Sequence, residues 1–138
     1  MLFRSDESGV DPAGVRRLVV CSGKVYYDLI AHKGEERDRS AIVRLELLYP
    51  FPKAAIEQVL ARYPSAEDVV WVQEEPRNMG PWHYAEPRLR KRLREGQTLR
   101  YAGRPGRASP AEGSAVAHRE QQAAIVREAF GGARVAAG

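Results

Sequence analysis

The sequence predicts an α/β fold, a three-layer sandwich in which a mainly parallel sheet carries helices on both faces. Three observations support this prediction. Four short runs of strand-forming residues alternate with segments of helical periodicity along the 138 residues. Each connection between successive strands is long enough to contain a helix, and such crossovers join parallel strands. The run 68–73 has almost no internal polar residue, as expected for a strand covered on both faces.

The first half of the chain contains two strand and helix pairs. Residues 1–16 are polar and broken by glycine and proline, so we expect a linker leading into the domain. The expected strands are Arg17–Cys21 and Ala41–Leu48. The expected helices are Lys24–His32 and Lys53–Tyr63, the second with apolar residues at helical spacing.

The second half repeats the pattern. The expected strands are Asp68–Gln73 and Thr98–Ala102, and the expected helices are Trp82–Arg94 and His118–Phe130. Gly131 and Gly132 follow the last helix and are typical of a helix end. We therefore assign residues 17–132 to one domain and residues 133–138 to a flexible tail, a size that fits a single compact unit.

Composition and charge narrow the class of protein. The chain is 43% hydrophobic and 29% charged, which is typical of a soluble globular protein. Its longest apolar runs fall well short of the roughly 18–20 residues that a membrane helix needs. The charged start of the chain differs from a signal or transit peptide, and the single cysteine, Cys21, indicates a reducing compartment. We expect a cytoplasmic protein with no membrane partner.

Arginines are concentrated in one segment, 88–107, where Glu95 is the single acidic residue. Such a field can attract phosphates or an acidic protein surface, or it can be the solvated face of a helix. The segment lacks the interleaved aromatic residues expected for binding single strands, so we expect no nucleic-acid partner.

Two segments are candidates for binding an anion. Ser22, Gly23 and Lys24 follow the first strand, and ligands of open α/β sheets bind at the carboxyl ends of strands. Ser22 can cap the next helix and Lys24 adds positive charge, although the full glycine-rich phosphate fingerprint is absent. Arg104 and Arg107 lie in a loop after the fourth strand, and arginine forks suit phosphate or carboxylate. The alternatives are a capped turn at the first segment and a domain contact at the second.

The segment from Gln73 to Trp82 is the densest in functional residue types. Glu74 and Glu75 are adjacent at a strand end, so they point in different directions and are poorly placed to share one catalytic task. A structural or subunit-contact role is the favoured interpretation.

The sequence shows no catalytic constellation and no metal-binding spacing. His32, His83 and His118 are far apart from one another and from Cys21, which we expect to be a buried strand residue. We therefore predict no catalytic residue and no metal ligand in this chain.

Five segments, in order, resemble one enzyme family. They are Cys21–Leu29 (CSGKVYYDL), Leu48–Pro52 (LYPFP), Trp71–Trp82 (WVQEEPRNMGPW), Tyr101–Pro105 (YAGRP) and Ala108–Ala111 (ASPA). They resemble the end of the decarboxylating component of 2-oxoglutarate dehydrogenase. The resemblance implies a transketolase-type C-terminal domain, whose parallel sheet usually has one antiparallel edge strand.

The resemblance also implies cofactors and partners. In this family thiamine diphosphate and magnesium are bound between earlier domains of a homodimer, whose motif is absent here, so we expect this chain to be an inactive fragment that binds neither. The whole enzyme decarboxylates 2-oxoglutarate in the tricarboxylic acid cycle and passes the succinyl group to dihydrolipoyl succinyltransferase. Expected partners are therefore the remaining domains, the dimer partner and the succinyltransferase.

A regulatory nucleotide is a further expectation, because some relatives bind AMP or acetyl-coenzyme A against this domain. The positions that we nominate for it are Ser22, Lys24, Arg104 and Arg107. Two alternatives remain open: the equivalent domain of another thiamine-diphosphate enzyme, and a free-standing nucleotide-binding module.

Overall fold

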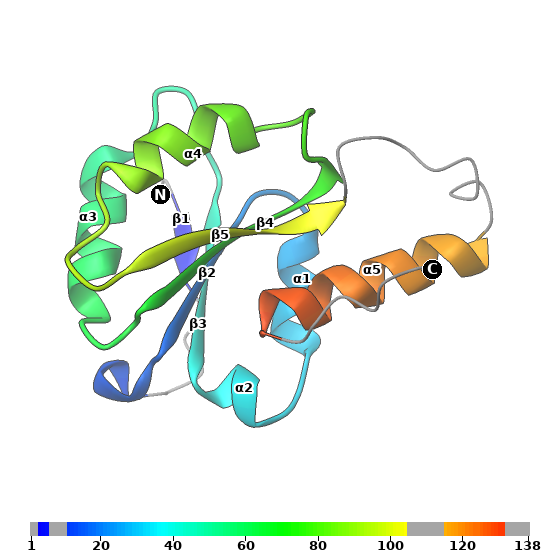
Figure 1. Cartoon of the computed structure of the whole chain (residues 1–138), viewed down its shortest axis with the longest axis horizontal. Coiled ribbons are helices and arrows are strands. Elements are labelled where there is room, and N and C mark those ends of the chain that lie inside the picture. Colours follow the sequence, from blue (N-terminus) through cyan, green and yellow to red (C-terminus); the bar gives the residue numbers. More distant parts are fainter. Residues whose placement is uncertain (1–2, 6–10, 105–114, 132–138) are drawn as a thin grey trace.

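The computed structural model describes residues 3–5, 11–104 and 115–131, which form a single sheet with helices on both sides (Figure 1). The strands are β1 (Phe3–Ser5), β2 (Arg17–Cys21), β3 (Ser40–Leu45), β4 (Asp68–Pro76) and β5 (Thr98–Arg104). The helices are α1 (Val25–Ala31), α2 (Glu35–Asp38), α3 (Lys53–Arg62), α4 (Trp82–Arg90) and α5 (Ala115–Ala129), with a 3-10 helix, η1, at Pro12–Gly14.

The sheet confirms the predicted parallel core. Its strand order is β1-β3-β2-β4-β5, and the four strands from β2 to β5 run parallel. β1 lies at one edge and pairs antiparallel with β3, with Phe3 opposite Leu45 and Ser5 opposite Val43. Because the parallel strands share a direction, their amino ends meet at one edge of the domain and their carboxyl ends at the other.

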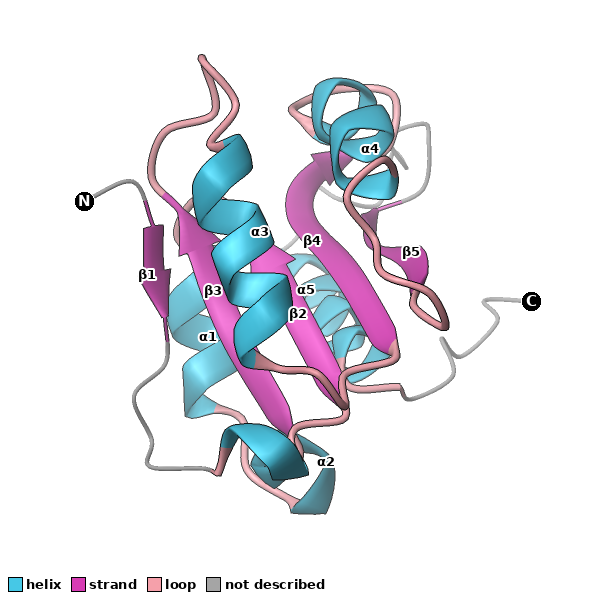
Figure 2. Cartoon of the chain, turned by 90° about the vertical axis from the view of Figure 1, so that its left-hand side faces the viewer, coloured by secondary structure: helices cyan, strands magenta, loops and turns pink. Residues whose placement is uncertain are grey.

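The domain has three layers, with the sheet in the middle and helices on each face. An apolar cluster joins the helices to the sheet on each side. α3 and α4 pack on one face around Trp71, and α1 and α5 pack on the other around Val70 and Val72 (Figure 2). Adjacent strand residues therefore point into different clusters, as the pleat requires. Trp71, Val70 and Val72 are all fully buried, which confirms that this strand is covered on both faces.

The structure differs from the sequence prediction at several element ends. Phe3–Ser5, which we assigned to a linker over residues 1–16, forms the edge strand β1 instead. Three residues are too few to show a strand periodicity, and their pairing depends on the distant strand β3. The short helix α2 was likewise not predicted.

The largest excess in predicted length occurs at one strand and one helix. The strand predicted over Ala41–Leu48 ends at Leu45, and the helix predicted over Trp82–Arg94 ends at Arg90. After Leu45 the chain leaves the sheet, and Leu47 becomes exposed. The predicted tail, residues 133–138, lies outside the described residues.

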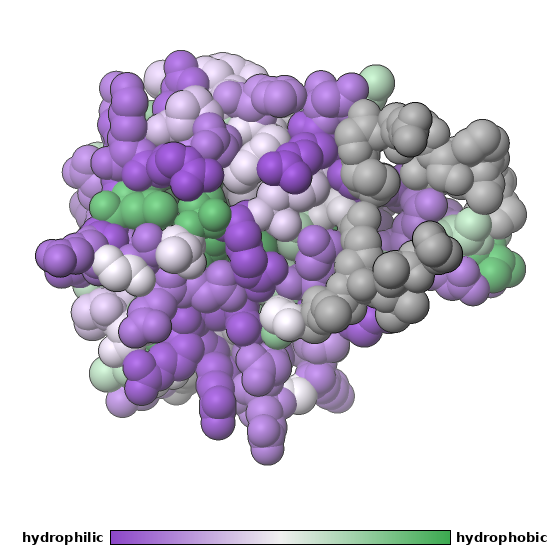
Figure 3. Space-filling model, viewed as in Figure 1, coloured by the Kyte–Doolittle hydropathy of each residue, from purple (hydrophilic) through white to green (hydrophobic). Residues whose placement is uncertain are grey.

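The surface is largely hydrophilic in the view of Figure 3, apart from small hydrophobic areas between α4 and β5 and at the start of α5. Leu93, which precedes β5, and Leu99, its second residue, are only partly buried and pack on the core beneath α3 and α4. Among the described residues, no helix has both the length and the apolar character needed to cross a membrane.

Candidate functional site

The carboxyl edge of the sheet holds the residues that the sequence nominated, at least those within the described ranges. Ser22 and Lys24 follow β2, and Arg104 is the last residue of β5. Arg107 lies outside the described residues. β4 runs between β2 and β5, so it separates the first two residues from Arg104.

Lys24 contacts β4 through an ion pair. Its Nζ lies 3.2 Å from Oε2 of Glu74, and the Lys24 side chain is 78% exposed while that of Glu74 is 18% exposed. The helix α1 has Lys24, not Ser22, at its N-cap, and that cap makes no side-chain hydrogen bond. The expectation that Ser22 caps this helix is therefore wrong, because the chain turns through Gly23 (φ +82°) and starts the helix two residues later.

Arg104 is directed toward α5. Its guanidinium nitrogen lies 3.1 Å from Nδ1 of His118, and Arg104 is half-buried. The structure thus places Lys24 and Arg104 at the same edge, but each contacts a different element. They are not brought together around one point.

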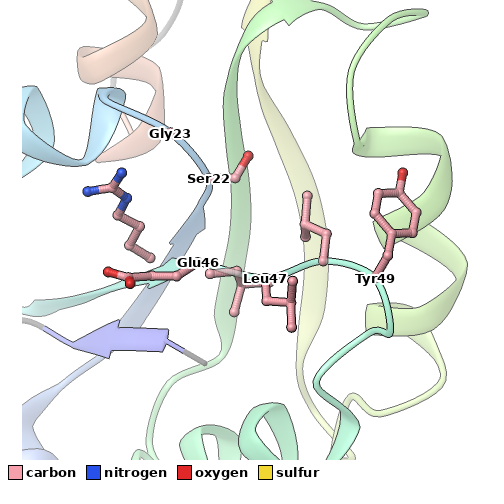
Figure 4. A pocket seen from close by; sticks show the side chains of 8 residues that line it. Ser22, Gly23, Glu46, Leu47 and Tyr49 are labelled. Carbon is pink, nitrogen blue, oxygen red and sulfur yellow. The ribbon is translucent and has the colours of Figure 1, made fainter. Parts of the chain in front are cut away.

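A pocket of about 620 Å³ opens beside the start of α1 at this edge (Figure 4). It is lined by Ser22 and Gly23 after β2 and by the end of β3 with its following loop, namely Arg44, Leu45, Glu46, Leu47, Leu48 and Tyr49. Of the nominated residues that the structure describes, Ser22 alone belongs to its lining. In the view of Figure 4, Ser22 and Tyr49 lie on either side of the pocket, with Leu47 between them.

Arg44 is a pocket residue that sequence reasoning missed. Its guanidinium carbon lies 5.4 Å from the centre of the Tyr27 ring, and its Nη1 donates to the Tyr27 hydroxyl at 3.2 Å. The available clue was a charged residue inside the apolar run Ala41–Leu48. A cation over an aromatic face is stabilised by the ring quadrupole, so Arg44 joins β3 to α1.

The loop after β4 is organised by Gln73, which is fully buried. Its Nε2 donates to the carbonyl oxygens of Glu75 (3.2 Å), Pro76 (3.0 Å) and Met79 (2.8 Å). Its Oε1 accepts from the indole nitrogen of Trp71 at 2.9 Å. One buried amide therefore fixes the path of the whole loop.

The two adjacent carboxylates near the end of β4, Glu74 and Glu75, have different surroundings. Glu74 pairs with Lys24, whereas the Glu75 side chain approaches the backbone of Gly80 so closely that a Cβ there would lie 2.8 Å from Glu75 Oε2. Gly80 also has a φ of +69°, which favours glycine. This arrangement supports a structural role for the segment from Gln73 to Trp82.

The nucleophile and base candidates are also separate. Burial raises the pKa of the Cys21 thiol to about 12, and the nearby positive charge of Arg44 offsets this only in part. His32 stacks on Phe130 with ring centres 4.8 Å apart, His118 contacts Arg104, and His83 is exposed on α4. In the part of the chain that the structure describes, no three His, Cys, Asp or Glu side chains gather as metal ligands would.

The amino edge carries an ion cluster that sequence reasoning missed. Asp68, the first residue of β4, accepts from Nε of Arg17 and from Nε of Arg100, both at 2.8 Å. Arg17 also pairs with Glu36 of α2 at 3.0 Å. We call Arg17, Asp68, Arg100 and Glu36 the amino-edge cluster.

Arg100 also holds the end of α5. Its Nη1 and Nη2 donate to the carbonyl oxygens of Glu128 (2.8 Å) and Ala129 (3.0 Å) in the last turn of α5, where the helix dipole favours a positive charge.

Several arginines of the predicted basic segment, 88–107, make contacts within the domain. Arg100 pairs with Asp68, Arg90 pairs with Glu86 at 2.7 Å, and Arg88 donates to the carbonyl of Tyr84 at 2.8 Å. Much of its charge is therefore used within the fold.

Comparison with known proteins identifies the family. The family model described as 2-oxoglutarate dehydrogenase C-terminal matches residues 2–130. The chain is 44% identical over 126 residues to the 2-oxoglutarate dehydrogenase E1 component of Cupriavidus necator, covering 91% of this chain and 13% of that protein. It is 50% identical over 121 residues to the E1 component of Geobacillus kaustophilus, covering 86% of this chain and 13% of that protein. The chain spans about 13% of the length of these curated relatives, and it belongs to the 2-oxoglutarate dehydrogenase C-terminal family.

Proposed function

We propose that this chain is the non-catalytic C-terminal domain of a 2-oxoglutarate dehydrogenase E1 component and that it stabilises the dimer of that enzyme. The observation that supports this most directly is a match over 91% of the chain to only 13% of an E1 relative. The parent enzyme would decarboxylate 2-oxoglutarate and transfer the succinyl group to its succinyltransferase partner.

The described residues do not fit the cofactor of this family, thiamine diphosphate with magnesium. Magnesium prefers carboxylate oxygens and the cofactor's own phosphates. At the carboxyl edge, Glu74 is engaged by Lys24 and Glu75 is turned against Gly80. We therefore assign the cofactor to other domains of the parent enzyme and derive no step through it here.

The state of the reactive side chains supports a non-catalytic role. A thiol needs to ionise to act as a nucleophile, and the buried Cys21 has a pKa of about 12. The three histidines lie apart from one another in the described residues, since His32 stacks on Phe130, His118 contacts Arg104 and His83 is exposed on α4.

A test uses the E1 component of Cupriavidus necator. Deleting the segment that matches this chain should abolish 2-oxoglutarate-dependent reduction of an artificial electron acceptor and weaken the dimer. A fusion in which this chain replaces that segment should restore both, whereas an unrelated α/β domain of similar size should restore neither.

The isolated chain supplies the second half of the test. Given thiamine diphosphate, magnesium and 2-oxoglutarate, it should show no turnover. Activity of the isolated chain would contradict the non-catalytic role, and a folded fusion that is inactive and monomeric would contradict membership in an E1 enzyme.

We also propose that the carboxyl edge binds a regulatory nucleotide, AMP or acetyl-coenzyme A, through Ser22, Lys24, Arg104 and Arg107. Supporting observations are that Ser22 lines the 620 Å³ pocket and that the Lys24 side chain is mostly exposed at the same edge. A nucleotide would have to span β4 to contact both Lys24 and Arg104, which suits an extended ligand better than a lone phosphate.

Calorimetric titration of this chain with AMP and with acetyl-coenzyme A measures the affinity of the proposed nucleotide site. Lys24→Ala and Arg104→Ala should each weaken binding, and Lys33→Ala, which changes an exposed lysine in the loop after α1, should not. Equal affinity in all variants would remove these positions from the site.

A further inference from the structure

Two of the loops at the carboxyl edge carry exposed apolar side chains. Among the described residues the large exposed apolar side chains are Tyr27, Ile30, Leu47, Tyr49, Met79 and Val116. Leu47 and Tyr49 belong to the loop after β3, and Met79 belongs to the loop after β4; their exposed fractions are 44%, 61% and 60%. We call these three residues, together with the adjoining pocket, the carboxyl-edge surface.

Tyr49 is held in place although it is exposed. Its ring lies 4.2 Å from that of Tyr84 on α4, centre to centre. The guanidinium carbon of Arg88 lies 3.7 Å from the centre of the Tyr84 ring, and Nη1 of Arg88 donates to the Tyr84 carbonyl. Aromatic and cation–π contacts of this kind restrain Tyr49 before any partner arrives.

Met79 is fixed by its backbone. Its carbonyl accepts from the buried Gln73 amide at 2.8 Å, and its N–H donates to the carbonyl of Pro76 at 2.8 Å. Gly80 then turns the chain back with a positive φ. A fully buried glutamine is thus used to hold a loop whose tip presents an apolar side chain to solvent.

Such pre-ordering is what a protein interface requires. Ordering a loop and its side chains on association costs free energy, and a loop that is already ordered avoids this cost. Tyrosine and methionine are enriched in interfaces, and anchor residues of one partner fill pockets of the other. The pocket between Ser22 and Tyr49, bordered by Leu47, is placed to receive such an anchor (Figure 4).

We infer that the carboxyl-edge surface is where this domain docks on the rest of its parent E1 polypeptide, an inference that depends on the proposed function. The occupant follows from the comparisons, since about 13% of each relative corresponds to this chain and the remainder of the parent must pack somewhere on it. The docking segment presents an apolar side chain to the pocket and covers Tyr49 and Met79.

Hydrogen–deuterium exchange on the isolated chain and on the Cupriavidus necator fusion locates the interface. Amides of residues 46–52 and 77–80 should exchange about tenfold more slowly in the fusion, because opening them would also require the interface to separate. Residues 35–38 of α2, at the opposite edge, should exchange alike in both proteins. Tyr49→Asp and Met79→Asp should remove the protection in the fusion, whereas Ile30→Asp should leave it unchanged.

Each outcome distinguishes the docking surface from the proposed function. An active fusion with protection elsewhere, for example on α1 or on the hydrophobic area between α4 and β5, overturns the docking surface and leaves the proposed function intact. An inactive fusion without protection overturns both. Protection that appears in the isolated chain as its concentration rises assigns the surface to a second copy and overturns the inference. Urea unfolding of the isolated variants shows whether a lost footprint reflects misfolding.

Discussion

At the amino edge of the sheet, Asp68 accepts hydrogen bonds from Arg17 and Arg100, and Arg100 in turn closes the end of α5. At the carboxyl edge, Leu47, Tyr49 and Met79 project into solvent from loops that buried groups hold in place. Charged groups at the first edge are paired with one another, and these three apolar groups at the second edge are about half exposed. The two edges therefore differ in chemistry, since ion pairs join elements of the fold at the first and apolar side chains are exposed at the second.

Removing the shared carboxylate of the amino edge should have the largest effect. Asp68→Ala leaves Arg100 without its carboxylate and leaves Arg17 with Glu36 alone, and loss of one partner of a buried charge pair costs about 3–5 kcal/mol. Because the Asp68 side chain is 28% exposed, we expect the lower end, about 3 kcal/mol in the free energy of unfolding by urea.

The neighbouring residue provides the matched control. Glu67 is exposed and contributes its backbone carbonyl to Thr98, so Glu67→Ala should change the stability by less than about 0.5 kcal/mol. Similar losses in the two variants would show that the amino-edge cluster does not secure this edge.

Gln73→Leu should have the next largest effect, and it connects the core to the carboxyl edge. Leucine fills similar space but leaves the Trp71 indole N–H and the loop carbonyls without their partner, which costs about 2 kcal/mol. Protease cleavage within residues 74–81 should become faster than in wild type. The control Gln58→Leu, on the exposed face of α3, should match wild type in the free energy of unfolding and in the cleavage rate. An unchanged cleavage rate would mean that Gln73 does not order this loop.

The elements that depend on local pattern were the ones that the sequence predicted well. The strand Arg17–Cys21 was predicted with the bounds that it has, and the helix predicted over Lys53–Tyr63 differs by one residue. Both have strong apolar patterns of their own. β1 was missed because its three residues form a strand only by pairing with β3, about 40 residues later in the chain.

The site depends on register, which local pattern does not contain. The order of strand and helix placed Ser22 and Lys24 at the carboxyl edge, where the structure also has them, and their role in binding a ligand stays a prediction. The ion pair of Lys24 with Glu74 and the cluster around Asp68 require that β2 and β4 pair with Arg17 opposite Asp68. Because the strands are parallel, their first residues could have been expected to lie close together. The sequence of a single strand, however, specifies neither which strands are neighbours nor which residues lie opposite one another.

Acid should weaken the amino edge specifically. Burial by itself raises the pKa of Asp68, but hydrogen bonds from Arg100 and Arg17 and their positive charges outweigh burial, so the pKa lies below its ordinary value. A carboxyl with a lowered folded pKa stabilises the fold above its unfolded pKa, and this contribution disappears as the pH falls through the folded value.

The unfolding free energies of wild type and Asp68→Asn should therefore differ by a constant amount above about pH 5 and converge below about pH 4. Urea unfolding at a series of pH values measures this difference. A gap that stays constant down to pH 2.5, or that widens in acid, would be incompatible with an ionised Asp68 at the centre of the cluster.

Substitutions in the exposed loop after β3 should have the smallest effect on the stability of the isolated chain. They distinguish the carboxyl edge from the amino edge most clearly. In the isolated chain Tyr49→Asp removes the ring contact with Tyr84, which contributes about 0.5–1 kcal/mol, and Leu47→Asp should have a similarly small effect because the Leu47 side chain is 44% exposed. Thermal unfolding of the isolated variants should therefore stay close to wild type, although Tyr49→Asp removes docking in the fusion. A loss as large as that of Asp68→Ala would show that Tyr49 supports the fold itself, and the carboxyl edge would then resemble the amino edge instead of contrasting with it. A small loss in the isolated chain together with a large one in the fusion requires that the stabilising partner of Tyr49 lies outside this domain.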